Sequence, residues 1–158
     1  SYNVDRIRDG GSFTTRRVTA IQSGEAILNL AASFQKEEPG FDHQDPMPKV
    51  SGPEGLLNHR EIAASYADKL PEKLRLAALG DKPFEFRPTD PDRDPASPVK
   101  DKPERFVWMK TIAPLPEERG LHSALLAYAS DYSFITTALK PHGVTWLSPG
   151  MHVASVVT

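Results

Sequence analysis

The first third of the chain alternates apolar and polar residues with the period of antiparallel strands. The pattern predicts three strands, Tyr2–Arg8, Phe13–Gln22 and Ala26–Gln35. Asp9-Gly10-Gly11 and Ser23-Gly24 separate them and are typical of tight hairpin turns. One face of the third segment is apolar throughout: Ala26, Leu28, Leu30, Ala32 and Phe34. We therefore predict a three-stranded meander with one buried face.

The middle of the chain changes to a proline-rich connector and then to helical spacing. Lys36–Gly55 carries four prolines and reads as a connector. Asn58 followed by Glu61 predicts a capping box at the start of a helix, whose apolar stripe is Ile62, Tyr66 and Leu70. Pro71 begins a second short helix that ends at Gly80. Its inward residues are expected to be Leu74, Ala77 and Ala78.

The last half combines short strands with one long apolar helical pattern. Phe84 and Phe86 alternate with Glu85 and Arg87, which predicts a short strand. A solvated loop is expected over Pro88–Glu104. A strand over Arg105–Ile112 follows, with Phe106, Trp108 and Ile112 on one face. The pattern then predicts a helix over Leu121–Leu139 and a final strand over Met151–Val157. A continuous helix over Leu121–Leu139 would be ~28 Å long. Such a helix could lie in the curve of an antiparallel sheet.

Composition narrows the class of protein. With 39% apolar and 25% charged residues among 158, the chain has the make-up of a folded globular protein. A net charge of −2 without a basic stripe argues against a nucleic-acid partner. No apolar run approaches the ~18 residues of a membrane span. The absence of cysteine excludes disulfides and thiolate catalysis and fits an intracellular protein. The first residue is not Met, so we expect a piece of a longer protein.

The acidic and imidazole side chains do not predict a metal site. Asp90, Asp92 and Asp94 have calcium-loop spacing, but the sixth and twelfth places hold Pro95 and Asp101 instead of Gly and Glu. The five histidines are scattered without helical ligand spacing: His43, His59, His122, His142 and His152. We expect neither a metal nor a cofactor.

Some further residues have side chains that could take part in chemistry or in structure. Arg16 and Arg17 point to opposite faces of a strand, which favours one solvated arginine and one paired with a carboxylate over a phosphate site. Asp131 sits in an apolar helical pattern, so it either borders a ligand tunnel or accepts hydrogen bonds from a loop or strand, the second being favoured. His142 is expected to cap a helix end, and Ser148-Pro149-Gly150 to form a turn rather than a nucleophile elbow.

Three groups of residues together resemble the acyl-CoA thioesterase II family. They are Arg8–Val18 (RDGGSFTTRRV), Ala31–Gln35 (AASFQ) with Phe41, His43, Gln44, Met47 and Pro48, and Tyr128–Tyr132 (YASDY) with Leu139 and Pro141-His142-Gly143. Their order and spacing agree along nearly the whole chain. The resemblance implies an α+β double hotdog, in which two curved antiparallel sheets each wrap a central helix. It also implies hydrolysis of fatty acyl-CoA, with acyl-CoA as substrate.

Mapped onto that fold, the chain would be incomplete. The resemblance assigns residues 1–35 to the last strands of the first hotdog, 36–83 to a linker with two short helices, and 84–158 to the first part of the second hotdog. The family's catalytic group is an Asp, a Thr or Ser, and a Gln. Its Asp position is Val157 here, and the other two positions lie beyond the end of the sequence, so no catalytic residue is carried over.

The resemblance therefore implies a truncated acyl-CoA thioesterase without its own activity. The alternative is a non-catalytic hotdog fragment that binds acyl-CoA or a partner protein. A homo-oligomer formed through the hotdog sheets is a further expectation, as is a location in the cytoplasm or the peroxisomal matrix. Substrate-binding residues are not identified by the resemblance.

Overall fold

The computed structural model describes residues 1–90 and 98–152 of the chain. Its contacts divide the chain into two compact units, Ser1–Met47 and Pro48–Thr158. Both antiparallel strand pairing and α-helices occur, so the α+β class expected from the sequence is observed. Among the described residues, no helix combines the length and the apolar character that a bilayer span requires.

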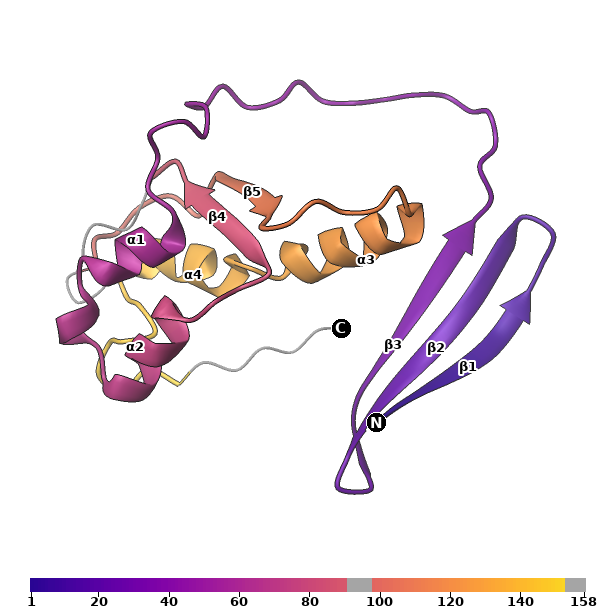
Figure 1. The fold of residues 1–158 in the computed structure, drawn as a ribbon, viewed down its shortest axis with the longest axis horizontal. Helices are drawn as coiled ribbons and strands as arrows, with labels where there is room; N and C mark the ends of the chain where they lie inside the picture. Colours follow the sequence, from indigo (N-terminus) through magenta and orange to yellow (C-terminus); the bar gives the residue numbers. More distant parts are fainter. Residues whose placement is uncertain (91–97, 153–158) are drawn as a thin grey trace. The chain divides into compact units, whose positions relative to one another are not determined.

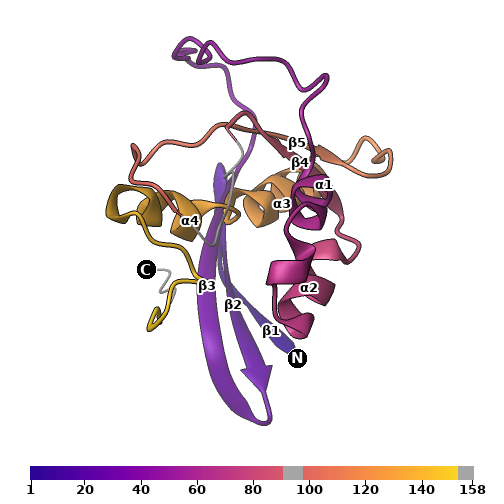
Figure 2. The same cartoon turned by 90° about the vertical axis from the view of Figure 1, so that its left-hand side faces the viewer.

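The first unit is an antiparallel meander of three strands (Figure 1). The strands are β1 (Tyr2–Asp9), β2 (Phe13–Gln22) and β3 (Glu25–Gln35). Both predicted hairpins form. In the second, Ser23 and Gly24 both have positive φ, 52° and 85°, which is the backbone of a two-residue turn that twists with its strands. Figure 2 shows the three strands curving together.

The predicted buried face of this sheet does not form within the first unit. Of the five residues expected on it, Ala32 alone is half-buried, while Leu28, Leu30 and Phe34 are about half exposed. The reason is architectural, because residues 1–47 form strands and connector and contribute no helix to cover the apolar side. Ala20, on the central strand β2, is the one buried residue of the sheet.

The second unit begins with three short helical segments. They are α1 (His59–Ala64), the 3₁₀ turn η1 (Ala67–Lys69) and α2 (Glu72–Leu79). The capping box is confirmed, since Asn58 Oδ1 accepts from the Glu61 N–H at 2.9 Å and Glu61 Oε2 accepts from the Asn58 N–H at 2.7 Å.

The apolar positions of these helices follow the predicted pattern only in part. The first helix ends at Ala64, so Tyr66 and Leu70 lie beyond it, although Leu70 is buried. In α2, Leu74 and Ala78 are half-buried, whereas Ala77 is exposed, contrary to expectation. Both differences arise because the helices are too short to carry a stripe over several turns.

A two-stranded antiparallel ribbon and two further helices complete the unit. The ribbon consists of β4 (Phe84–Pro88) and β5 (Val107–Thr111), and the helices are α3 (Arg119–Ser130) and α4 (Phe134–Leu139), followed by the 3₁₀ turn η2 (Lys140–His142). Strand β5 is shorter than predicted, and Phe106 and Ile112 lie just outside it. The core forms where Phe84 and Phe86 of β4 meet Ala129 of α3.

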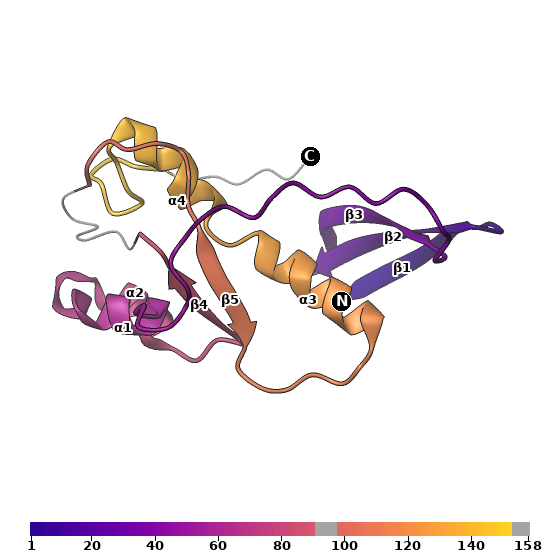
Figure 3. The same cartoon turned by 90° about the horizontal axis from the view of Figure 1, so that it is seen from above.

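The predicted continuous helix over Leu121–Leu139 is wrong. The chain leaves α3 at Asp131 and begins α4 only after Ser133, which has a left-handed backbone with φ of 75°. Figure 3 shows the two helices as separate segments joined by a bend. The hydroxyls of Thr136 and Thr137 both donate to the Ser133 carbonyl. These side-chain hydrogen bonds hold the first turn of α4 against the bend.

The predicted final strand is not observed in its described part, because Met151 and His152 have no strand pairing. The rest of that segment, residues 153–157, lies outside the described residues. The turn at Ser148-Pro149-Gly150 is confirmed, with Gly150 at φ 73° and the Met151 N–H donating to the Ser148 carbonyl at 3.1 Å.

Candidate functional site

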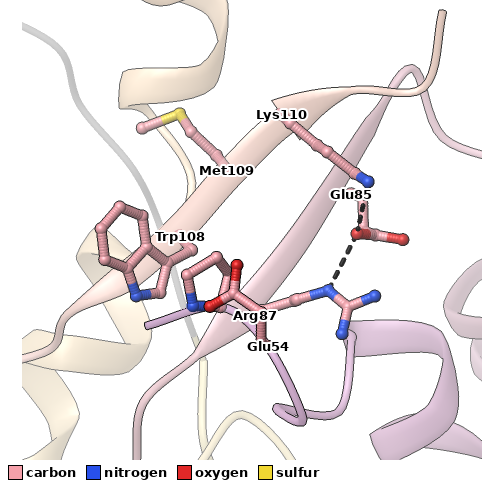
Figure 4. Close-up of a pocket in the computed structure, with 7 residues that line it drawn as sticks. Glu54, Glu85, Arg87, Trp108, Met109 and Lys110 are labelled. Atoms are coloured by element: carbon pink, nitrogen blue, oxygen red, sulfur yellow. Dashed lines mark hydrogen bonds and ion pairs between the residues drawn. The ribbon is translucent and has the colours of Figure 1, made fainter. Parts of the chain in front are cut away.

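The outer face of the β4–β5 ribbon carries the charged side chains of the strands. Alternation along β4 places Phe84 and Phe86 toward the core and leaves Glu85 and Arg87 on the other face. The antiparallel register pairs Glu85 with Lys110 and Arg87 with Trp108. A carboxylate, two cations and an indole therefore lie together on one side of the ribbon (Figure 4).

The charges on this face are paired with one another. Glu85 Oε1 accepts from Arg87 Nε at 2.9 Å and lies 3.5 Å from Lys110 Nζ. The hydrogen bond from Arg87, supported by the charges of both cations, lowers the pKa of the Glu85 carboxyl. The same hydrogen bond raises the pKa of the Arg87 guanidinium. Both shifts favour the ionised forms of Glu85 and Arg87, so neither of these two groups is poised to exchange a proton at neutral pH.

The connector before α1 lies against this face. Trp108 Nε1 donates to the Ser51 carbonyl at 2.8 Å, and Arg87 Nη1 donates to the Leu56 carbonyl. Between connector and ribbon lies an open recess of about 410 Å³. Its lining residues are Pro53, Glu54, Glu85, Arg87, Trp108, Met109 and Lys110. Among these lining residues is no hydroxyl, thiol or imidazole, and the recess presents charged and polar groups to a ligand.

Sequence reasoning placed Glu85 and Arg87 in a strand but did not identify this recess. Alternation alone already separates the two charged residues from Phe84 and Phe86. The register that adds Lys110 and Trp108, and the contact with Ser51 from 57 residues away, are decided by tertiary structure. Opposite charges are favoured at facing positions of neighbouring strands, and this preference could have suggested the pairing of Glu85 with Lys110 from the sequence.

The core face of the ribbon carries a stack of aromatic rings. Phe86 lies between His59 and Tyr132, with ring centroids 5.5 Å and 4.6 Å away. Phe84 stacks on Tyr128 at 6.0 Å, and the hydroxyls of Tyr128 and Tyr132 lie 3.1 Å apart. That hydrogen bond, together with burial, raises the pKa of Tyr132. The stack joins α1, β4 and α3 into one packed layer.

The acidic loop is held by a lysine that sequence reasoning did not single out. Lys140 Nζ lies 2.8 Å from Asp90 Oδ2 and 3.1 Å from Asp101 Oδ2, and it donates to the Glu104 carbonyl at 2.9 Å. Burial disfavours its charge, but the hydrogen bonds to the two aspartates outweigh this and raise the pKa of Lys140. Asp92, Asp94 and Pro95 lie outside the described residues. The loop is therefore anchored by Lys140 on both sides of residues 91–97.

The histidines are spread over separate elements. His59 stacks on Phe86, His122 Nε2 lies 2.9 Å from the Pro116 carbonyl, and His43 lies 3.7 Å from Asp45 at an exposed position. His142 ends η2, the place at which capping was predicted, and His152 is exposed. Within residues 1–90 and 98–152, no three His, Asp or Glu side chains gather as a metal would require.

Two predictions about single charged residues are wrong. Arg16 and Arg17 were expected to be one solvated and one paired, yet Arg16 binds Asp9 and Arg17 binds Asp5 at 2.9 Å. The neighbouring strand β1 supplies both carboxylates: Asp5 faces Arg17 directly, whereas Asp9 faces Thr14 and reaches Arg16 diagonally. Asp131 was expected to accept hydrogen bonds, but it lies exposed at the C-terminal cap of α3, and its carboxylate accepts none from the described part of the chain.

Val157, the position of the family's Asp in the resemblance, lies outside the described residues. Of the expected site residues, the described part of the chain brings Asp90 and Asp101 together around Lys140 and does not bring any histidines together.

Comparison with known proteins gives matches along most of the chain. The family model described as "Acyl-CoA thioesterase" matches residues 90–157. Acyl-CoA thioesterase 2 of Haemophilus influenzae is 37% identical over 155 residues, which are 98% of this chain and 54% of that protein. Acyl-coenzyme A thioesterase 8 of mouse and of human are 36% and 35% identical, each over 89% of this chain and 46% of the relative. The chain thus spans about half the length of these relatives.

Solved structures resemble the fold over a similar extent. The crystal structure of an acyl-CoA thioesterase II from Mycobacterium marinum matches 89% of this chain and 47% of its own, with a TM-score of 0.61 and 33% identity. The tesB protein of Mycobacterium avium subspecies paratuberculosis matches 91% of this chain with the same TM-score and 22% identity, and it supports the fold alone.

Proposed function

Because the chain belongs to the acyl-CoA thioesterase II family and spans about half the length of its relatives, we propose that it is part of a fatty acyl-CoA hydrolase. The observation that carries this proposal is the structural match at 33% identity over 89% of the chain. The reaction is hydrolysis of the thioester to a free fatty acid and coenzyme A. An intracellular site of action, in the cytoplasm or the peroxisomal matrix, belongs to the same proposal.

The finer architecture that we propose is an incomplete double hotdog. The packing of α3 against the β4–β5 ribbon through Phe84, Phe86 and Ala129 supports it, because a hotdog sheet lies against one central helix. In this arrangement residues 1–35 are the last strands of the first hotdog, 36–83 the linker with its two short helices, and 84–158 the opening part of the second. The amphipathic first sheet is consistent with a missing helix on its apolar side.

We further propose that this chain does not hydrolyse acyl-CoA on its own. Thioester hydrolysis through a positioned water needs a group that takes the proton and donors that stabilise the oxyanion. At the family's Asp position this chain has Val157, whose aliphatic side chain can neither accept a proton nor orient a water. We do not assign this role to the recess on β4–β5, because Glu85 there is paired with Arg87 and Lys110.

A thioesterase assay tests the proposal directly. The purified 158-residue chain is incubated with acyl-CoA substrates of short, medium and long chain length, and released thiol is followed. We expect no turnover above the buffer rate. Turnover well above buffer that survives further purification would show that the chain holds a complete catalytic group, and the assignment of Val157 would be wrong.

Val157 also favours a second candidate, a hotdog fragment that binds acyl-CoA or a partner without catalysis. Isothermal titration with a non-hydrolysable acyl-CoA ether separates the two. Saturable binding without turnover supports the binding role, whereas neither binding nor turnover would leave the chain as a scaffold part of a longer hydrolase.

A further inference from the structure

The recess on the outer face of the β4–β5 ribbon is lined by two rows of facing residues. Glu85 faces Lys110 in the first row, and Arg87 faces Trp108 in the second. Residues two apart on one strand lie about 7 Å from each other, so this is the distance between the rows. The two rows therefore form two distinct ends of the recess.

The connector adds a carboxylate to the end that the second row forms. The Ser51 carbonyl accepts from Trp108 Nε1. The Leu56 carbonyl accepts from Arg87 Nη1. Glu54, which also lines the recess, lies between these two anchors in sequence. Within residues 1–90 and 98–152 its carboxylate takes part in no hydrogen bond or ion pair. This end thus offers two oxygen acceptors together with an indole ring that its own hydrogen bond holds in place.

The first row is the positive end of the recess. Glu85 is shared by two cations, Arg87 and Lys110, so the three side chains together carry one positive charge. The Lys110 side chain is 71% exposed, and its ammonium has three protons to donate. Arg87 donates through Nε and Nη1, which leaves its Nη2 without a partner in the part of the chain that the structure describes. Donors for an anion therefore remain at this end.

We propose that the recess binds a small zwitterion, an organic molecule whose ammonium and carboxylate groups lie about 7 Å apart. The carboxylate of the ligand pairs with Lys110 and with Nη2 of Arg87. Its ammonium pairs with Glu54 and lies against the indole ring of Trp108, where a cation–π contact adds to the ion pair. The recess volume of about 410 Å³ is in the range of small-molecule sites.

Charge complementarity selects a zwitterion over a ligand with a single charge. A ligand that carries only a cation meets the net positive charge of the first row, and a ligand that carries only an anion meets the carboxylate of Glu54. A zwitterion places each of its charges against the opposite one. Because the lining charges are partly exposed to solvent, each ion pair contributes little, and the affinity should be in the millimolar range. The site goes beyond the proposed hydrolysis and does not depend on it.

The fluorescence of Trp108 tests the proposal with the full chain. The chain has two tryptophans, so Trp146→Phe leaves Trp108 as the single reporter. The probe is 6-aminohexanoate, whose extended chain separates its two charges by a distance similar to that between the rows. We expect a saturable change in the emission of Trp108 at millimolar concentration. Two further probes, 6-aminohexanamide and 6-acetamidohexanoate, keep the same chain with only one charge each, and both should bind several-fold more weakly.

Substitutions at both ends of the recess complete the test. Glu54→Gln and Lys110→Gln each remove one charge and should each weaken the binding of 6-aminohexanoate several-fold. Glu38→Gln is the matched control, because it removes an exposed carboxylate of the connector outside the recess, and it should bind like the parent chain. Far-UV circular dichroism must show the same secondary structure in every variant. No saturable change in emission, equal or tighter binding of either singly charged probe, or unchanged binding by Glu54→Gln would each overturn the proposal.

Discussion

At the scale of single residues, Lys140 links segments that are distant in sequence. Its side chain is 9% exposed, and its ammonium contacts Asp90, Asp101 and the Glu104 carbonyl. A buried ammonium is stable only when its hydrogen bonds are satisfied, and here three acceptors surround it. The Asp101 N–H also donates to the Lys140 carbonyl at 3.1 Å, so main chain and side chain hold the same loop.

Replacing this lysine by an apolar residue of similar length should destabilise the second unit. For Lys140→Met we expect a loss of about 1–2 kcal/mol in the free energy of unfolding, because charge-assisted hydrogen bonds are lost while the partly exposed aspartates regain water. Urea unfolding followed by circular dichroism measures the loss. Lys73→Met, on the exposed side of α2, is the control and should change stability little. Equal stability of both variants would show that Lys140 contributes nothing net.

The pKa of Asp101 predicts how stability changes in acid. The N–H of Lys102 and then the ammonium of Lys140 lower this pKa in the folded state. A carboxyl with a lowered folded pKa stabilises the protein above its unfolded pKa of about 3.9, and this stabilisation is lost as the pH falls through the folded value. Asp101→Asn should therefore lose less stability than the wild type between neutral and strongly acid pH. Urea midpoints at the two pH values measure this, and parallel losses would contradict it.

At the scale of elements, the break between α3 and α4 follows from one strained residue and its neighbours. Ser133 adopts a left-handed backbone, which costs a non-glycine residue about 1–2 kcal/mol. The gain is that Tyr132 packs its ring 4.6 Å from that of Phe86. In a straight helix over the same residues, the apolar side chains after Ser133 would point in other directions than they do in α4. We therefore attribute the bend to the packing of side chains and not to local helix preference.

Replacing Ser133 at the bend and Ser130 in α3 by glycine should change the stability of the chain in opposite directions. Ser133→Gly removes the left-handed strain and should stabilise the chain by about 0.5–1 kcal/mol, after allowing for the freer unfolded chain. Ser130→Gly, at the end of α3, should destabilise it by about 0.5–1 kcal/mol. Thermal unfolding of the pair measures both signs. If Ser133→Gly is the less stable variant, the left-handed backbone is not a source of strain.

At the scale of the whole molecule, a long connector separates the two units. Residues 36–49 are exposed and have no regular secondary structure. The boundary between the two compact units, after Met47, lies within this connector. Unpaired exposed backbone is the substrate that proteases require, because a chain must be extended to enter their active sites. The strands and helices on either side hold their backbone in hydrogen bonds.

Limited trypsin digestion should therefore cut first at Lys36 or Lys49, the two lysines of this connector. Mass spectrometry of the earliest fragments identifies the sites. Arg16, in the central strand β2, is the internal comparison and should be cut much later. Early cleavage within β1–β3, with both connector lysines intact, would contradict the division into two units.

Elements held by neighbours in sequence were predictable, and contacts between distant segments were not. The hairpins at Gly10 and Gly24 and the capping box at Asn58 follow from residues within four positions of each other. The recess on the β4–β5 ribbon and the Lys140 contacts join residues 31 to 57 positions apart. Loop closure of that length has no local signature in the sequence.

The sequence by itself thus determined the meander, the two short helices with the capping box at Asn58, the amphipathic character of the first sheet and the resemblance to the acyl-CoA thioesterase II family. Periodicity and turn chemistry are local properties, so they can be read along the chain. Only the tertiary structure decided that the long apolar helix bends at Ser133, that both Arg16 and Arg17 find carboxylates, and that Lys140 anchors the acidic loop. These outcomes depend on which side chains meet in space, and packing overrides local preference wherever burial is at stake.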